Sequence, residues 1–88
     1  MPFLFIRTCD ADFESVDDGA HYERAEDALA IGIEGAVGIA RDEIQKGART
    51  SAVEIRIEGA DGAPVLRSVV AISIASLWVT AQSPTGDT

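Results

Sequence analysis

The stretch SAVEIRIEGADGAPVLRSVVAI, residues 51–72, decides the fold. In its first half the apolar residues Val53, Ile55 and Ile57 alternate with charged residues, a pattern typical of a strand with one buried and one solvated face. GADG (59–62) has turn chemistry, and Pro64 stands at the start of a strand, where a missing N–H does least harm. The stretch therefore predicts an antiparallel hairpin.

Before this hairpin, residues 23–46 contain no proline and predict one long helix, because their apolar residues follow a helical period. Gly47 stands where a left-handed residue commonly ends a helix, so we expect the last turn to include Lys46. The stripe expected to face the sheet comprises Tyr22, Leu29, Ile33, Ala36, Ala40 and Ile44.

The N-terminal part predicts a second hairpin. PFLFIRT (2–8) is apolar on both faces, FESV (13–16) is a short partner strand, and DDG (17–19) provides a turn in which Gly19 takes a positive φ. The sequence therefore predicts an α+β fold of order ββαββ, with one long helix packed on a four-stranded, mainly antiparallel sheet. We expect a single domain over residues 1–81 and a disordered C-terminal tail over 82–88, while residues 73–81 fit a helix or a strand.

The glycines of GIEGAVG (32–38) do not form a cofactor motif. Their G-x-x-G-x-x-G spacing differs from the dinucleotide fingerprint, no strand precedes them, and no Lys-Ser/Thr pair follows them. On the helix they are expected to lie away from the stripe of Leu29, next to Ile31 and Ile39, as a smooth apolar strip suited to contact. The alternative is that the helix tolerates these glycines without any contact.

The charge of the chain restricts its partners. Fifteen acidic residues against seven basic ones give a net charge of −8, which disfavours nucleic acid and anionic membranes and favours basic or neutral partners. The apolar run 68–81 is too short to span a membrane, and the only cysteine, Cys9, excludes an internal disulfide. We therefore expect a cytoplasmic protein without nucleic-acid or membrane partners.

The acidic stretch DADFESVDDGAH (10–21) contains two candidate sites, one for a metal ion and one for acid–base catalysis. Asp10, Asp12 and Glu14 have the spacing of a calcium loop, but the glycine and the final glutamate that such a loop needs are missing. His21 lies close in sequence to Asp17 and Asp18 and could act as a general base, yet no nucleophile accompanies it. We therefore expect no metal, no cofactor and no catalytic residue.

Four segments together resemble a known family: MPFLFIR, DDG at 17–19, EDALAIGIEGAVGIARDEIQKG, and VEIRIEGADGAPVLR. The chain is similar over residues 1–72 to a family of short uncharacterised bacterial proteins defined only as a domain of unknown function. The resemblance implies the same fold and brings no activity, cofactor or catalytic residue. The chain departs from the family pattern by having glycines in place of helix alanines and by lacking a proline before the helix.

These observations favour a non-enzymatic protein-interaction module that self-associates as a homodimer. One helix covers one face of a sheet, so the second face and the sheet edges are expected to need cover. A monomer would result if residues 73–81 folded back across that face. The alternatives are an antitoxin-like or regulatory partner of a basic protein and, third, a small acid–base enzyme. The candidate interaction residues are Ile31, Gly32, Gly35, Gly38, Ile39, Val69, Leu77 and Trp78.

Overall fold

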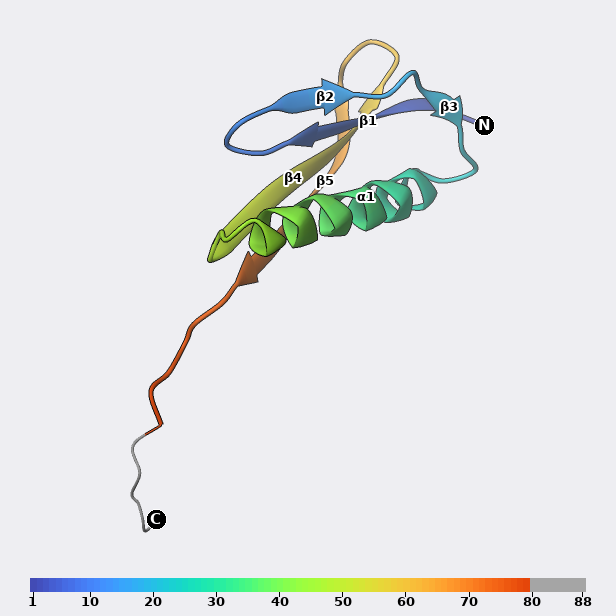
Figure 1. The fold of residues 1–88 in the computed structure, drawn as a ribbon. Helices are drawn as coiled ribbons and strands as arrows, with labels where there is room; N and C mark the ends of the chain where they lie inside the picture. Colours follow the sequence, from blue (N-terminus) through green and yellow to red (C-terminus); the bar gives the residue numbers. More distant parts are fainter. Residues whose placement is uncertain (80–88) are drawn as a thin grey trace.

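The computed structural model describes residues 1–79 and contains one helix packed against one face of an antiparallel sheet (Figure 1). The strands lie in the order β2-β1-β4-β5, and the short β3 pairs with the beginning of β1. The predicted α+β fold is confirmed, with β3 as an additional short strand. The elements are β1 (Phe3–Cys9), β2 (Glu14–Val16), β3 (Ala20–His21), α1 (Ala25–Gln45), β4 (Thr50–Gly59) and β5 (Pro64–Ser73).

The core lies between α1 and the central strands. Val53, Ile55 and Ile57 of β4 are fully buried, and Leu4 and Ile6 of β1 pack beside them. Burying each aliphatic side chain of this size stabilises the fold by roughly 1.5–3 kcal/mol. The alternation predicted for residues 51–59 is therefore confirmed, with the apolar face of β4 turned toward α1.

The helix faces the sheet with its smallest residues. Its buried positions are Ala28, Gly32, Ala36 and Ala40. A Cβ atom added to Gly32 would lie 2.5 Å from Cγ2 of Ile55 and 3.1 Å from Cγ2 of Ile6. The prediction that Gly32 lies on the outer flank is therefore wrong, because close approach to the sheet selects residues without bulk. Of the predicted stripe, Ala36 and Ala40 are buried, and Tyr22, Leu29 and Ile33 pack at the margin of the core.

The two ends of α1 differ in their capping hydrogen bonds. The N-cap residue Arg24 makes no side-chain capping hydrogen bond. At the other end Gly47 has φ +108°, as predicted, and the N–H groups of Gly47 and Ala48 donate to the carbonyls of Ile44 and Glu43, each at 3.0 Å. These two bonds form the Schellman motif, which satisfies carbonyl groups that the helix itself cannot pair.

Residues 74–79, here called the C-terminal arm, leave the domain in line with β5 and form neither helix nor strand (Figure 1). Leu77 is 84% exposed and Trp78 98% exposed, so this part of the chain does not fold back across the sheet. The rest of the predicted segment 73–81 and the predicted disordered tail 82–88 lie outside the described residues. No helix within residues 1–79 is long and apolar enough to cross a membrane.

Candidate interaction surfaces

The outer edge of β5 carries unpaired backbone groups. Within residues 1–79, β5 pairs with β4 alone. The N–H of Ile74 donates to the carbonyl of Arg49 at 2.8 Å, which makes these two residues a hydrogen-bonded pair that continues the β4–β5 register. Such pairs alternate along an antiparallel ladder, so Val70 and Ile72 bond to β4, while Arg67, Val69 and Ala71 direct their N–H and C=O groups outward.

The helix runs parallel to β5, as two contacts show. Gly32 lies over Ile55, and the hydroxyl of Ser51 donates to the carboxylate of Glu43, so residue numbers rise along α1 as they fall along β4. Because β4 and β5 are antiparallel, Leu29 lies at the same end of the sheet as Leu66.

An apolar seam follows this edge on the side of the sheet that faces α1. Leu66, Val70 and Ile72 of β5 are only half-buried, as are Leu29 and Ile33 of α1, although all five pack against the core. Val37 continues the same flank of the helix and is 36% exposed. We call this set the β5 seam: Leu29, Ile33, Val37, Leu66, Val70 and Ile72.

The other flank of α1 borders a shallow groove of about 300 Å³ next to β1 and β2. Four of the predicted interaction residues line it, namely Ile31, Gly32, Gly35 and Ile39. The remaining four lie elsewhere: Gly38 on the open side of α1, Val69 on β5, and Leu77 and Trp78 on the C-terminal arm. The eight residues therefore do not form a single surface.

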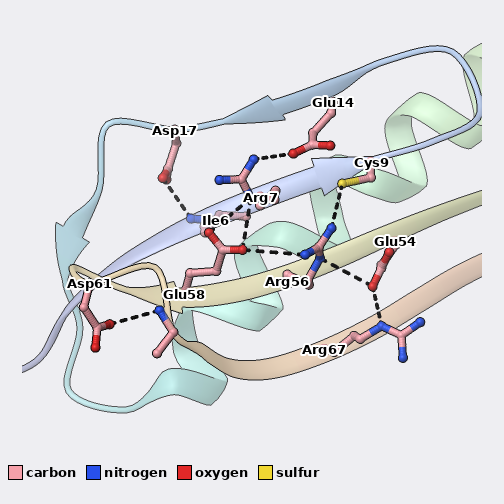
Figure 2. Close-up of polar contacts among 11 residues, drawn as sticks. Ile6, Arg7, Cys9, Glu14, Asp17, Glu54, Arg56, Glu58, Asp61 and Arg67 are labelled. Carbon is pink, nitrogen blue, oxygen red and sulfur yellow. Dashed lines mark hydrogen bonds and ion pairs between the residues drawn. The ribbon is translucent and has the colours of Figure 1, made fainter.

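The sheet face opposite α1 is charged at its centre, as the alternation of β4 predicts. Arg7, Arg56 and Arg67 lie in one cross-strand row over β1, β4 and β5 (Figure 2). Three glutamates separate these like charges, and they are Glu14, Glu54 and Glu58. Ion pairs occupy the centre of this face, whereas Val65 and Val69 at its β5 margin are 49% and 52% exposed. The expectation that this face needs cover stays a prediction.

Within this network the best defined contact joins β1 to β4. Nε of Arg7 lies 3.1 and 3.0 Å from the two carboxylate oxygens of Glu58, a residue that is only 7% exposed. Glu54 contacts Arg67, and this hydrogen bond holds the pKa of Glu54 below its usual value. The E-x-R-x-E alternation of β4 indicated a polar face, but the arginine row required the register between distant strands.

Three carboxylates gather at the C-terminal end of α1. Asp10, Asp12 and Glu43 present oxygens that all lie within 4.8 Å of one another, beside a hollow of about 430 Å³. Oδ1 of Asp10 accepts the N–H groups of Asp12 at 2.8 Å and Phe13 at 2.9 Å, and the bond from Asp12 is the main cause of the lowered pKa of Asp10. These bonds are those of a turn, and Glu14, the third residue of the calcium spacing, pairs with Arg7 instead.

Within residues 1–79, no hydrogen bond or ion pair joins His21 to Asp17 or Asp18. Oδ1 of Asp17 accepts the N–H groups of Ile6 at 2.9 Å and Gly19 at 3.2 Å, so this carboxylate organises the turn. Nδ1 of His21 lies 3.2 Å from the carbonyl oxygen of Met1, and its ring packs edge-on against Phe3. Each side chain therefore has a local structural partner.

Comparison of the chain with protein-family models, curated proteins and solved structures found no match. The resemblance to short bacterial proteins with a domain of unknown function therefore stays a prediction. What can be proposed about function comes from the surfaces described above.

Proposed function

We propose that the protein is a non-enzymatic interaction module of the cytoplasm that self-associates as a homodimer through the free edge of β5. The observation that carries this proposal is the combination of outward backbone groups with the apolar β5 seam along one ten-residue strand. A free edge of this length is a template for another strand, and proteins usually protect it with charges, prolines or bulges.

Protection of this kind is confined to one end of β5. Pro64 and the irregularity between Ile57 and Glu58 both lie at the turn end of the hairpin. The one charged side chain of the strand, Arg67, is turned to the open face, where it pairs with Glu54. From Val69 to Ser73 the edge offers a free ladder without a charge.

A two-fold axis at Val69 uses this edge most fully. An antiparallel pairing of two β5 strands then places Val69 opposite its own copy and Arg67 opposite the partner's Ala71, so no like charges meet. The outward N–H and C=O groups of one β5 then bond to those of its copy, and both helices lie on the same face of the joined sheet. The result is an isologous interface in which the two β5 seams lie side by side.

The proposal is tested by the molar mass from light scattering coupled to size exclusion. We expect about twice the chain mass of 9.3 kDa for the natural sequence. Val69→Pro removes an outward N–H without removing a bond to β4, so this variant should fold with the same circular dichroism and run as a monomer. Val69→Thr keeps both the N–H and the β-branched shape, and should remain a dimer. The proposal would be contradicted if the natural sequence had the mass of a single chain at high concentration, or if Val69→Pro were dimeric.

A second candidate is a regulatory, antitoxin-like role toward a basic protein, favoured by the net charge of −8. The solvent side of α1 contributes exposed acids, among them Glu26, Glu34 and Asp42. We expect a basic partner to be retained from a host lysate at low salt and released at high salt, because screening weakens contacts between exposed charges. Retention of acidic or neutral proteins alone would count against this candidate.

A further inference from the structure

We infer that the groove between α1 and β2 binds an amphipathic helix that belongs to a basic protein. This inference rests on the second candidate function, for which it names the contact surface and the form of the partner, and it is independent of the β5 dimer. The groove has a volume of about 300 Å³. The residues without a polar side chain that line it include Ile6, Ile31, Gly32, Gly35 and Ile39.

The groove exists because the sheet is wider than its one helix. Within residues 1–79, α1 packs on β4, β5 and β1 but not on β2, so this side of the α1 face has no covering layer (Figure 1). The helix wall of the groove is low, since a Cβ atom added to Gly35 would meet nothing within 4 Å. Ile31 on the same wall is 54% exposed. The backbone of a second helix can therefore come close to α1 here.

One end of the groove is acidic, because both of its walls lead to a carboxylate. Asp10 follows Thr8 of β1 by two residues, and Glu43 follows Ile39 of α1 by four. Side chains two apart in a strand, or four apart in a helix, lie on the same face, so both carboxylates are in line with the groove. With Asp12 they form the cluster whose oxygens lie within 4.8 Å of one another.

The other charges around the groove leave it negative. Asp17 lines the groove beside Ile6, toward the beginning of β1, so the second end is acidic as well. The two bases on this flank of α1 are each paired with an acid of the same helical turn, Arg24 with Asp27 at 3.5 Å and Lys46 with Asp42 at 3.0 Å. Their positive charges are therefore already balanced.

Charge complementarity selects the occupant of the groove. An apolar middle with acidic ends fits an amphipathic helix that has an apolar side and basic residues at both ends. Such a helix would lie beside α1 on the β2 side of the sheet, at the roughly 8–10 Å that separate packed helices. A second copy of this chain does not fit, because it would bring the same acids, with a net charge of −8, against those of the first copy.

The test uses a synthetic helical peptide as long as α1, with leucines along one side and lysines at both ends. Added to isotope-labelled protein, it should shift the amide NMR signals of Ile31, Gly35 and Ile39 with a dissociation constant of about 1 mM or lower. A peptide of the same composition in scrambled order should not shift these signals, and neither should one with glutamate in place of lysine.

Variants of the protein locate the contact. Gly35→Leu fills the groove from an open helix position and should weaken peptide binding by about 10-fold or more. The matched control Ala30→Leu adds the same side chain at an exposed position on the solvent side of α1, and should leave binding unchanged. Asp12→Asn should weaken binding and its dependence on salt, whereas Glu26→Gln, on the other flank of α1, should change neither.

The outcomes separate this inference from the second candidate function. Capture from a host lysate at low salt is repeated with Gly35→Leu and Ala30→Leu, and we expect the basic partner to be lost in Gly35→Leu alone. A basic protein that both variants retain would overturn the groove contact and leave the basic partner standing. Absent shifts with the lysine peptide, or equal shifts with the scrambled one, would also overturn the groove contact. Retention of acidic or neutral proteins alone by the natural sequence would overturn both.

Discussion

At the level of single residues, two glycines one helical turn apart have opposite roles. Gly32 lies against Ile55 and Ile6 with no room for a Cβ atom, whereas a Cβ atom at Gly35 would meet nothing within 4 Å. Gly35→Ala should stabilise the protein by ~0.5–1 kcal/mol, because alanine loses less backbone entropy in a helix. Gly32→Ala should destabilise it by ~1–3 kcal/mol, since the helix or fully buried Ile55 must shift. Urea denaturation of both variants checks this pair, and two changes of the same sign would contradict it.

The charged face allows a second comparison between residues. Glu58 is nearly buried and bonds Arg7 through both oxygens, while Glu14 bonds the same arginine from an exposed position. Neutralising a carboxylate that is shielded from water removes more interaction energy than neutralising an exposed one. Glu58→Gln should therefore lower the melting temperature more than Glu14→Gln does. Equal losses of melting temperature in the two variants would contradict the expected difference between the buried and the exposed carboxylate.

At the level of elements, β5 is expected to have two classes of amide. The N–H groups of Leu66, Ser68, Val70 and Ile72 bond to β4, and those of Arg67, Val69 and Ala71 point outward. In monomeric Val69→Pro, hydrogen exchange should be slow in the first class and fast at Arg67 and Ala71. In the natural sequence at dimer-forming concentrations both classes should be slow. Outward amides that exchange equally fast in both proteins would argue against strand pairing.

The elements also show what a sequence can predict. The order of the elements and their ends follow local patterns, and Gly19 and Gly47 do take the positive φ values expected of them. Side-chain size does not predict which side of α1 faces the sheet, because Ala28 and Gly32 are buried there while the larger Leu29 lies at the margin. The strand order and the arginine row depend on pairing between distant segments. The alternation of residues 65–72 places Val69 on the face opposite Leu66 and Val70, but its place on a free edge follows only from that strand order.

At the level of the whole molecule, the two faces of the sheet differ in chemistry: one is charged, and the other is apolar and packs against α1. The face opposite α1 carries ion pairs at its centre, and the α1 face has a buried centre with apolar margins. The free edge of β5 and its seam lie along one of these margins. The exposed arm projects beyond it (Figure 1). Pairing through β5 would satisfy the free edge and bury the seam with one symmetry operation, and this is the central claim.

Disulfide cross-linking at the proposed axis tests this claim most directly. In a Cys9→Ser background, Val69→Cys would place two cysteines opposite each other with Cα atoms about 5.5 Å apart, within the range that a disulfide spans. We expect this variant to form a covalent dimer rapidly under mild oxidation. The control Ile31→Cys, whose position is 54% exposed on the other flank of α1, should stay monomeric. Cross-linking of Val69→Cys no faster than that of Ile31→Cys would contradict the β5 dimer.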